Sequence, residues 1–310
     1  MRKVLGIAAS VLLVLAATGF WYFSSSRTRM VSLPLGEREA TPQAANLHSV
    51  VPRPAHVIVF IEENKSFDDI VGNTKEAPYL NALIPHAALF TQSYGVSHPS
   101  QPNYLALFAG RTNTNGDACE VSGIPATADN LGTELLSHGL TFVGYAEGLP
   151  APGYRGCIAG DYARKHAPWT YFPAIPASSI QPFTAFPRNY AKLPTVAFVI
   201  PDLQDDMHSG SIAHGDAWLR RTLTPLVAWA ARHNTLIIIT WDESSEPLSN
   251  HIPTLFVGPM VRPGRYAEPI THYAVLRTIE DIYGLPHAGQ AADVEPIIDC
   301  WSVPTTRYAR

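Results

Sequence analysis

Acidic side chains follow three apolar runs of the sequence at the point where each run ends. Runs 56–61, 195–200 and 235–241 have the unbroken aliphatic composition of buried strands. The polar residues that come after them are Glu62, Glu63 and Asn64, then Asp202, Asp205, Asp206 and His208, and finally Asp242 and Glu243. Carboxyl ends of parallel strands meet at one edge of a sheet, and clustered carboxylates repel one another unless a cation neutralises them. The pattern therefore predicts a divalent metal site at that edge.

A candidate nucleophile lies in the segment 98–104, which reads His-Pro-Ser-Gln-Pro-Asn-Tyr and precedes an expected helix. Ser100 would then lie at the N-cap or in the first turn, where free N–H groups and the helix dipole favour a bound phosphate. Asn103 lies three residues further on, and we expect it to donate to a phosphoryl oxygen. A nearby metal ion would lower the pKa of the Ser100 hydroxyl and make it a nucleophile. The alternative is that Ser100 only caps the helix.

Histidines and a basic segment supply further candidates. His251 stands at the entrance of a strand-like run and is a candidate metal ligand or phosphate contact. Lys165 and His166 belong to a basic loop that could cap an anionic substrate, although a solvated turn is the alternative. His272 opens a predicted helix, where a surface residue is the alternative to a ligand.

Composition limits the class of protein. The chain has 310 residues, which is room for one large α/β domain or two modest ones. Hydrophobic residues make up 46% and charged residues 15%, so disorder across the whole chain is excluded. A formal net charge of -4 argues against a nucleic-acid binder, which normally carries a basic surplus.

Strand-like runs alternate with segments of helical spacing, which favours an α/β fold. The helical segments are 130–138, 216–233 and 272–283, and the weaker strand-like runs are 89–94, 141–145 and 253–257. We expect a mostly parallel central sheet with helices on both faces. Segment 146–194 is rich in proline, glycine and aromatic residues and is predicted to be one long loop or cap.

The N-terminal part of the sequence is typical of an exported protein. Arg2 and Lys3 precede the apolar run 4–23, as in a signal peptide or an N-terminal membrane anchor. Small residues at 16–18 suit cleavage, whereas the aromatic residues at 20–23 suit a retained anchor, so both alternatives stay open. The expected organisation is an export segment over 1–26, a linker over 27–55 and a catalytic domain over 56–310. The protein would be periplasmic, anchored in the cell envelope or secreted.

The sequence has three cysteines, and one disulfide is plausible in an oxidising compartment. Cys119 and Cys157 both lie in glycine-rich loop sequence and are our preferred pair, although Cys300 could equally pair with either. Their spacing carries no zinc-finger signal.

These motifs together resemble the phosphoesterase family that holds acid phosphatases and phosphatidylcholine-type phospholipases C, within the alkaline-phosphatase-like superfamily. The resemblance runs from about residue 56 to residue 285. The segments that carry it are Glu62–Asp68, His98–Tyr104, Tyr162–Pro168, Pro201–Leu219, Thr240–Glu243 and His251–Pro259.

The resemblance implies a role for each matching position. The implied metal ligands are Glu63, Asn64, Asp242 and Glu243, with Ser100 as both nucleophile and ligand. The residues implied to line the same pocket, as ligands of a second metal or as phosphate contacts, are Asp206, His208 and His251. Those implied to bind the substrate phosphate or protonate the leaving group are Lys165 and His166. Two-zinc members of the superfamily have other ligands at these positions, so one or two ions, and zinc, magnesium or calcium, all stay open.

The sequence thus predicts a metal-dependent phosphoric-ester hydrolase, most simply an acid-phosphatase-like phosphomonoesterase that acts through a phosphoserine intermediate. Its substrate would be a phosphorylated small molecule or lipid head group. One alternative is a phospholipase C-type phosphodiesterase, although the phospholipases of this family are usually much longer. An alternative from another class is a non-catalytic, envelope-anchored binding protein with the same fold.

Overall fold

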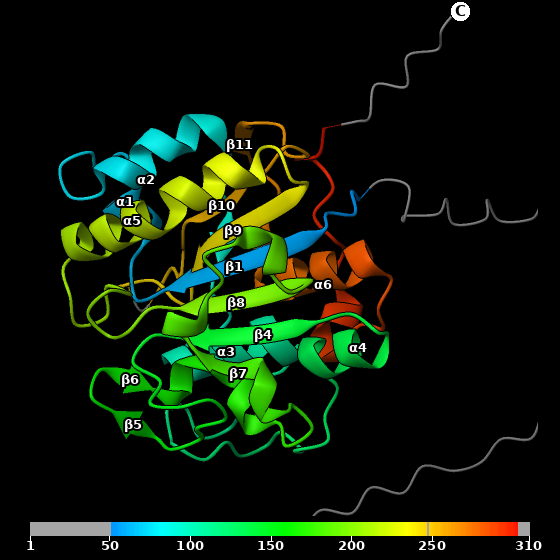
Figure 1. Cartoon of the computed structure of the whole chain (residues 1–310). Helices are drawn as coiled ribbons and strands as arrows, with labels where there is room; N and C mark the ends of the chain where they lie inside the picture. The colour runs from blue at the N-terminus through cyan, green and yellow to red at the C-terminus, as the bar shows by residue number, and fades with distance from the viewer. Residues whose placement is uncertain (1–50, 247, 303–310) are drawn as a thin grey trace, which may run out of the picture. The chain divides into compact units, whose positions relative to one another are not determined.

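The computed structural model describes residues 51–246 and 248–302, and its centre is an eight-stranded sheet with the order β11-β2-β10-β9-β1-β8-β4-β7 (Figure 1). In chain order these strands are β1 (His56–Glu62), β2 (Ala88–Phe90), β4 (Phe142–Ala146), β7 (Ile180–Pro182), β8 (Val196–Ile200), β9 (Thr235–Trp241), β10 (Thr254–Val257) and β11 (Gly264–Tyr266). Strands β9, β1, β8, β4 and β7 are parallel, whereas β10 is antiparallel to both β9 and β2. The predicted α/β fold with a mostly parallel sheet is confirmed.

Helices cover both faces of the sheet, which explains why its strands are apolar without interruption. In β1, Val57, Val59 and Ile61 face one hydrophobic cluster, while Ile58 and Phe60 face the other. The first cluster contains residues of α3 (Ser100–Ala109), α4 (Leu131–Ser137) and α6 (His272–Tyr283). The second contains residues of α1 (Phe67–Ile70), α2 (Pro78–Leu83) and α5 (Ile212–Ala230), and Figure 1 shows α2 and α5 lying together.

Local sequence signals set several element boundaries. Helix α5 begins earlier than predicted because the Ser211 side chain accepts a hydrogen bond from the N–H of His214. Helix α6 matches the predicted range and ends before Gly284, which has a left-handed conformation. The strand-like run 89–94 is divided: β2 stays in the main sheet, and β3 (Ser93–Tyr94) pairs with β12 (Ile270–Thr271).

Segment 146–194 is the loop region that was predicted, with short elements inside it. These are β5 (Ile158–Ala159), β6 (Tyr162–Ala163), η3 (Arg164–His166), η4 (Pro168–Tyr171), η5 (Ala177–Ser179), η6 (Phe183–Ala185) and η7 (Tyr190–Lys192). The remaining 3-10 turns are η2 (Ile84–His86) and η8 (Gly289–Asp293). Strand β7 was not predicted, because three residues that include a proline carry no readable strand periodicity.

A disulfide joins Cys119 to Cys157, with their Cα atoms 5.4 Å apart, and Cys300 is a buried free thiol. The preferred pairing is therefore confirmed. The bond ties the loop after α3 to the residue just before β5, so these two segments are linked covalently.

The predictions for the export segment over 1–26 and for residues 27–50 of the linker lie outside the described residues. Within the described part of the chain, no helix combines the length and apolar character that a bilayer crossing requires.

Gly144 in β4 is expected to be intolerant of a side chain. A Cβ atom there would come within 2.1 Å of the buried Trp169 ring. We expect Gly144→Ala to lower the free energy of unfolding by about 1–3 kcal/mol through overpacking, measured by thermal and urea unfolding. The matched control is Gly264→Ala, since a Cβ at Gly264 meets nothing closer than 3.4 Å. Equal stability of the two variants would contradict this packing account.

Candidate active site

Ser100 is the first residue of α3, and carboxylates from two strand ends converge on it. Its Oγ atom lies 3.1 Å from Glu63 Oε2 and 3.2 Å from Glu243 Oε1. Glu63 follows β1 and Glu243 follows β9, and these strands are parallel neighbours. Ser100 is only 2% exposed, so the hydroxyl lies inside the site rather than on the helix surface. The structure thus brings together the three groups that the sequence placed at one sheet edge.

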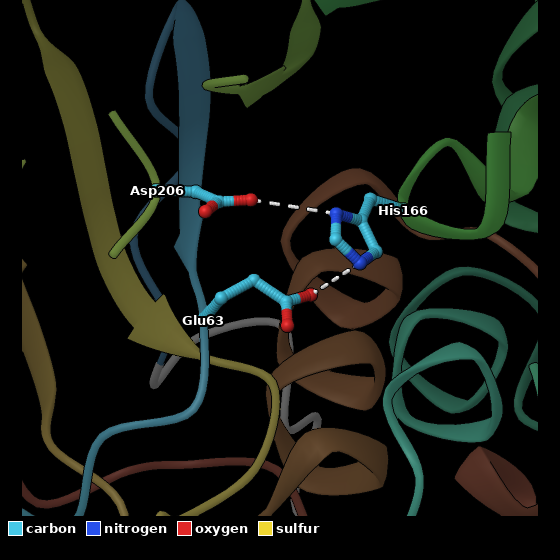
Figure 2. Close-up of side chains that lie close together, drawn as sticks. All are labelled: Glu63, His166 and Asp206. Carbon is cyan, nitrogen blue, oxygen red and sulfur yellow. Dashed lines mark ion pairs between the residues drawn. The ribbon is translucent and has the colours of Figure 1, made fainter. Parts of the chain in front are cut away.

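A buried cation-carboxylate cluster lies beside this serine. Figure 2 shows Glu63 and Asp206 approaching the His166 ring at its two different nitrogen atoms. Glu63 Oε1 lies 2.9 Å from His166 Nε2, and Asp206 Oδ2 lies 3.4 Å from Nδ1. All three side chains are almost completely buried. Ligand atoms of the three residues lie within 4.8 Å of one another, which is close enough to share a metal ion.

Charge pairing within this cluster decides its protonation. Burial alone would lower the pKa of His166, but the charges and hydrogen bonds of Glu63 and Asp206 outweigh it and raise the pKa to about 9. Burial likewise opposes ionisation of Glu63, yet His166 brings the pKa of that carboxyl down to about 2. Asp206 keeps a pKa raised to about 6, because burial dominates there. Without a bound cation, the pairing with Glu63 and Asp206 therefore favours the protonated imidazole.

Asp242 and Glu243 bring further negative charge from the end of β9. Burial raises the pKa of both groups, to about 7 for Glu243, and the charge of Glu63 adds to the effect. Asp242 Oδ1 accepts a hydrogen bond of 3.0 Å from the backbone N–H of Asn64. His272 lies 2.6 Å from the Asp242 carbonyl oxygen through Nε2, so it is buried and positions this strand end instead of lying on the surface.

Asn64 adopts the conformation that this geometry needs. Its φ angle is 49°, in the left-handed region that asparagine tolerates better than most residues. In this conformation the Asn64 side-chain Nδ2 donates to Glu63 Oε2 over 3.0 Å, while its backbone N–H points at Asp242. Asn64 therefore connects the two strand ends that carry the carboxylates.

The donor set fits a divalent cation. Among the described residues, Asp242 Oδ2 is buried and has no hydrogen-bond partner, while Asp206 Oδ2 and Glu243 Oε2 meet only the rings of His166 and His98. Buried carboxylate oxygens are ordinarily hydrogen-bonded or bound to a metal, since an uncompensated buried charge costs several kcal/mol (about 3–5). Carboxylates with one imidazole suit zinc as well as harder ions, so the residues do not select one metal.

A second positive group stands at the start of α3. Lys165 Nζ lies 2.6 Å from Asp117 Oδ2, and the backbone N–H of Gln101 donates to Asp117 Oδ1 over 2.9 Å. Burial would lower the pKa of Lys165, but the hydrogen bond and charge of Asp117 outweigh it and raise that pKa. Asp117 thus holds the ammonium group beside the amino-terminal turn of α3, where an anion is favoured.

His208 occupies an exposed position next to the cluster. Its backbone N–H donates to Asp206 Oδ1 over 2.7 Å, and its ring centroid lies 5.9 Å from that of His166. Burial of part of the ring lowers the pKa of His208. The structure therefore places His208 at the solvent side of the site, as a candidate contact to a substrate.

Asn103 does not have the role that its spacing predicts. Its Oδ1 accepts from the backbone N–H groups of Val96 and Ser97, and its Nδ2 donates to the carbonyl oxygens of Ser97 and Pro99. The amide is completely buried. Asn103 therefore holds the loop that leads into Ser100 in place, and its Nδ2 group already donates to two backbone carbonyl oxygens.

His251 is likewise drawn away from the carboxylates. Its ring stacks on Phe67 with centroids 4.5 Å apart, and its Nε2 lies 3.1 Å from the Thr91 carbonyl oxygen. This packing engages one ring nitrogen of His251, and the expectation that His251 binds the metal or the phosphate stays a prediction. The acidic residues also divide: Asp205 lies with Glu147 and Asp202 in a second group, separate from Asp206.

The sequence analysis missed three residues of the site. Tyr104 stacks on His166 with ring centroids 5.0 Å apart, and His98 Nδ1 lies 2.6 Å from Glu243 Oε2. The position of Tyr104, one helical turn after Ser100, is a signal that could have identified it. Asp117 had no such signal, because it lies in an irregular loop whose path depends on tertiary contacts.

The sequence is similar to those of known phosphatases. A sequence model of the Phosphoesterase family matches residues 73–286. The chain is 51% identical over 265 residues to a phosphatidylinositol-3-phosphatase of Mycobacterium tuberculosis, covering 84% of this chain and 88% of that protein. It is 31% identical to an acid phosphatase of Aspergillus fumigatus, covering 74% of this chain and 54% of that longer protein.

Solved structures share the fold at low sequence identity. An alkaline phosphatase superfamily protein from Vibrio parahaemolyticus aligns with a TM-score of 0.58 at 11% identity, over 80% of this chain and 72% of that one. A phosphonate monoester hydrolase from Silicibacter pomeroyi aligns with a TM-score of 0.58 at 14% identity, over 78% and 76% of the two chains.

The corrected role of Asn103 leads to a test. Asn103→Ala removes a buried amide that satisfies four backbone groups, so we expect a loss of stability of about 1–3 kcal/mol. Thermal unfolding measures this loss, and Asn189→Ala, in an exposed turn, is the control. An Asn103→Ala protein with unchanged stability but impaired substrate binding would restore the original expectation of a phosphate contact.

Proposed function

The chain belongs to the Phosphoesterase family and is a phosphoric-ester hydrolase, and we propose that it is a metal-dependent phosphomonoesterase with Ser100 as its nucleophile. The observation that carries this proposal is the Ser100 hydroxyl at the start of α3, within 3.2 Å of two carboxylates. A serine that only capped the helix would not need two carboxylates beside its hydroxyl group. This arrangement favours a nucleophile over the alternative of a simple cap.

The reaction would proceed in two in-line displacements. Ser100 Oγ forms a bond to phosphorus as the bond to the substrate alcohol breaks, and the serine proton has carboxylate acceptors at Glu63 and Glu243. A water molecule then hydrolyses the phosphoserine and releases inorganic phosphate. Glu63, Asn64, Asp206, Asp242 and Glu243 would hold a divalent cation, whose charge would lower the pKa of the hydroxyl and offset charge on the phosphoryl oxygens.

The basic residues of the site divide into two roles. Both ring nitrogens of His166 face carboxylates, so this buried imidazolium balances negative charge within the cluster. Lys165, which Asp117 holds at the positive end of α3, is suited to the phosphate oxygens. His208 is the exposed titratable group beside the cluster, and we assign it to protonation of the leaving oxygen.

The substrate is proposed from the relatives. The similarity to a phosphatidylinositol-3-phosphatase favours a phosphorylated inositol head group or another small phosphomonoester. The phospholipase C-type alternative predicts cleavage of phosphodiesters. Hydrolysis of p-nitrophenyl phosphate, of p-nitrophenyl phosphorylcholine and of vesicles containing phosphatidylinositol 3-phosphate would distinguish these possibilities.

We also place the enzyme outside the cytoplasm, with residues 4–23 as its signal peptide or membrane anchor. The disulfide between Cys119 and Cys157 supports this location, because such bonds persist in oxidising compartments. Mass spectrometry of the mature N-terminus would show whether the apolar run is removed.

Ser100→Ala tests the nucleophile. We expect kcat to fall at least about 1000-fold, since a covalent step is lost, with thermal unfolding unchanged within about 1 kcal/mol. Ser178→Ala, at an exposed position, should keep full activity. A Ser100→Ala enzyme that retains more than a few per cent of the activity would contradict the assignment.

Metal removal tests the cation. Treatment with EDTA and dialysis should abolish hydrolysis of p-nitrophenyl phosphate, because the clustered carboxylates would lose their neutralising charge. Adding zinc, magnesium or calcium separately, together with elemental analysis, would identify the ion. A fully active protein without bound metal would rule out this part of the proposal. A protein that contains no metal as purified, and that stays inactive after each ion is added, would support the alternative of a non-catalytic binding protein.

A further inference from the structure

Gln101, the residue directly after the nucleophile, is completely buried, and the proposed reaction gives it no role. Its side-chain Nε2 donates to the Ala118 carbonyl oxygen over 3.1 Å and to the Tyr171 hydroxyl oxygen over 2.7 Å. Its Oε1 accepts a hydrogen bond from Asn113 Nδ2. A buried amide is costly unless its polar atoms have partners, and both ends of this amide are paired.

These contacts hold the loop that follows α3 against the start of the same helix. Asn113 and Ala118 lie on either side of Asp117 in the sequence, and Asn113 Nδ2 also donates to the Gly116 carbonyl oxygen over 2.6 Å. The backbone N–H of Gln101 donates to Asp117 Oδ1 over 2.9 Å. Gln101 therefore meets this loop at three points, through its main chain and through both ends of its side chain.

Asp117 connects this loop to Lys165. Its two carboxylate oxygens have different partners, since Oδ1 accepts from the Gln101 N–H and Oδ2 lies 2.6 Å from Lys165 Nζ. A lysine ammonium group is carried on a flexible stem, so the partner that binds it decides where its charge lies. One carboxylate thus fixes the Lys165 ammonium group relative to the amino-terminal turn of α3.

A second connection reaches the same basic segment through Tyr171. The Tyr171 hydroxyl accepts from Gln101, and the Arg164 guanidinium group lies over the Tyr171 ring, 4.4 Å from its centroid. Arg164 is buried, so this cation-π contact belongs to the packed interior. Arg164 and Lys165 are consecutive residues of η3. Gln101 is therefore connected to η3 from two sides, through Asp117 and through Tyr171.

We propose that Gln101 is a positioning residue, which fixes Lys165 relative to Ser100 and thereby sets the affinity of the site for the substrate phosphate. This inference rests on the proposed function, because it takes Lys165 as the group that binds the phosphate oxygens. The Gln101 amide does not itself donate to the substrate, since its Nε2 protons are already given to Ala118 and Tyr171. Loss of the amide would displace the ammonium group without removing the nucleophile, so substrate binding should weaken more than the chemical step.

A double-mutant cycle separates this role from a purely structural one. Gln101→Met keeps a side chain of similar length and removes the amide, and Lys165→Met removes the ammonium group. The natural protein, both single variants and the double variant would be compared as purified. Calorimetry gives the dissociation constant for inorganic phosphate, and steady-state kinetics with p-nitrophenyl phosphate give KM and kcat.

We expect Gln101→Met to raise both the phosphate dissociation constant and KM about tenfold. The value of kcat should change less than about threefold, because the nucleophile is retained. In the Lys165→Met background, the same substitution should change the phosphate dissociation constant and KM less than about twofold, because the group that Gln101 positions is already absent.

Thr278→Val is the matched control for the loss of a buried hydrogen bond. Thr278 is completely buried in α6, and its hydroxyl accepts from the backbone N–H of Ile297 over 2.8 Å. This variant should have a lowered melting temperature, as Gln101→Met should, but its phosphate affinity and KM should stay at the natural values. Should Gln101→Met fail to fold, Tyr171→Phe removes one acceptor of the amide and should raise KM about threefold, again only when Lys165 is present.

Equal effects of Gln101→Met in the two backgrounds, or natural phosphate affinity and KM in the single variant, would overturn the inference. A natural protein that binds inorganic phosphate but does not hydrolyse the ester would contradict the proposed function, and the phosphate affinities of the four proteins would then decide the role of Gln101. A natural protein that neither binds phosphate nor hydrolyses the ester would overturn both.

Discussion

Buried negative charge is the constraint on which this site depends. Glu63, Asp206, Asp242 and Glu243 are all withdrawn from water at one edge of the sheet. His166 balances part of this charge through both of its ring nitrogens, and Tyr104 holds its ring in place by stacking. Carboxylates forced together in this way are unfavourable for folding unless a positive charge joins them, so the fold maintains a site that is suited to a cation.

Helix α3 connects that charge cluster to the chemistry. The helix begins at Ser100, so the hydroxyl lies at the positive end of the helix dipole, where Asp117 accepts the N–H of Gln101. The loop before it is held by the Asn103 amide, and the loop after it reaches back through Asp117 to Lys165. The disulfide restrains the same region covalently. Nucleophile, anion-binding groups and carboxylates are therefore placed by three independent parts of the chain.

Two adjacent pairs of acidic residues distribute charge to the two faces of the sheet. Glu62 and Glu63 diverge at the end of β1, and Asp205 and Asp206 diverge after β8. Glu63 and Asp206 join His166, whereas Asp205 lies with Glu147 and Asp202. Adjacent acidic residues at a strand end and in the turn after β8 thus enter different environments.

The sequence by itself determined the α/β class, the main strands, and the grouping of Glu63, Ser100 and Glu243, because strand ends and a helix start are local features with readable patterns. It could not determine that Asn103 supports a loop, that His251 packs on Phe67, or that Asp117 holds Lys165. Those roles depend on where irregular segments meet after folding, and hydrogen-bond partners distant in the chain leave no periodic signal. Residue spacing thus identified which groups reach the sheet edge. Only tertiary packing decided which of their atoms already form hydrogen bonds or packing contacts with other parts of the chain.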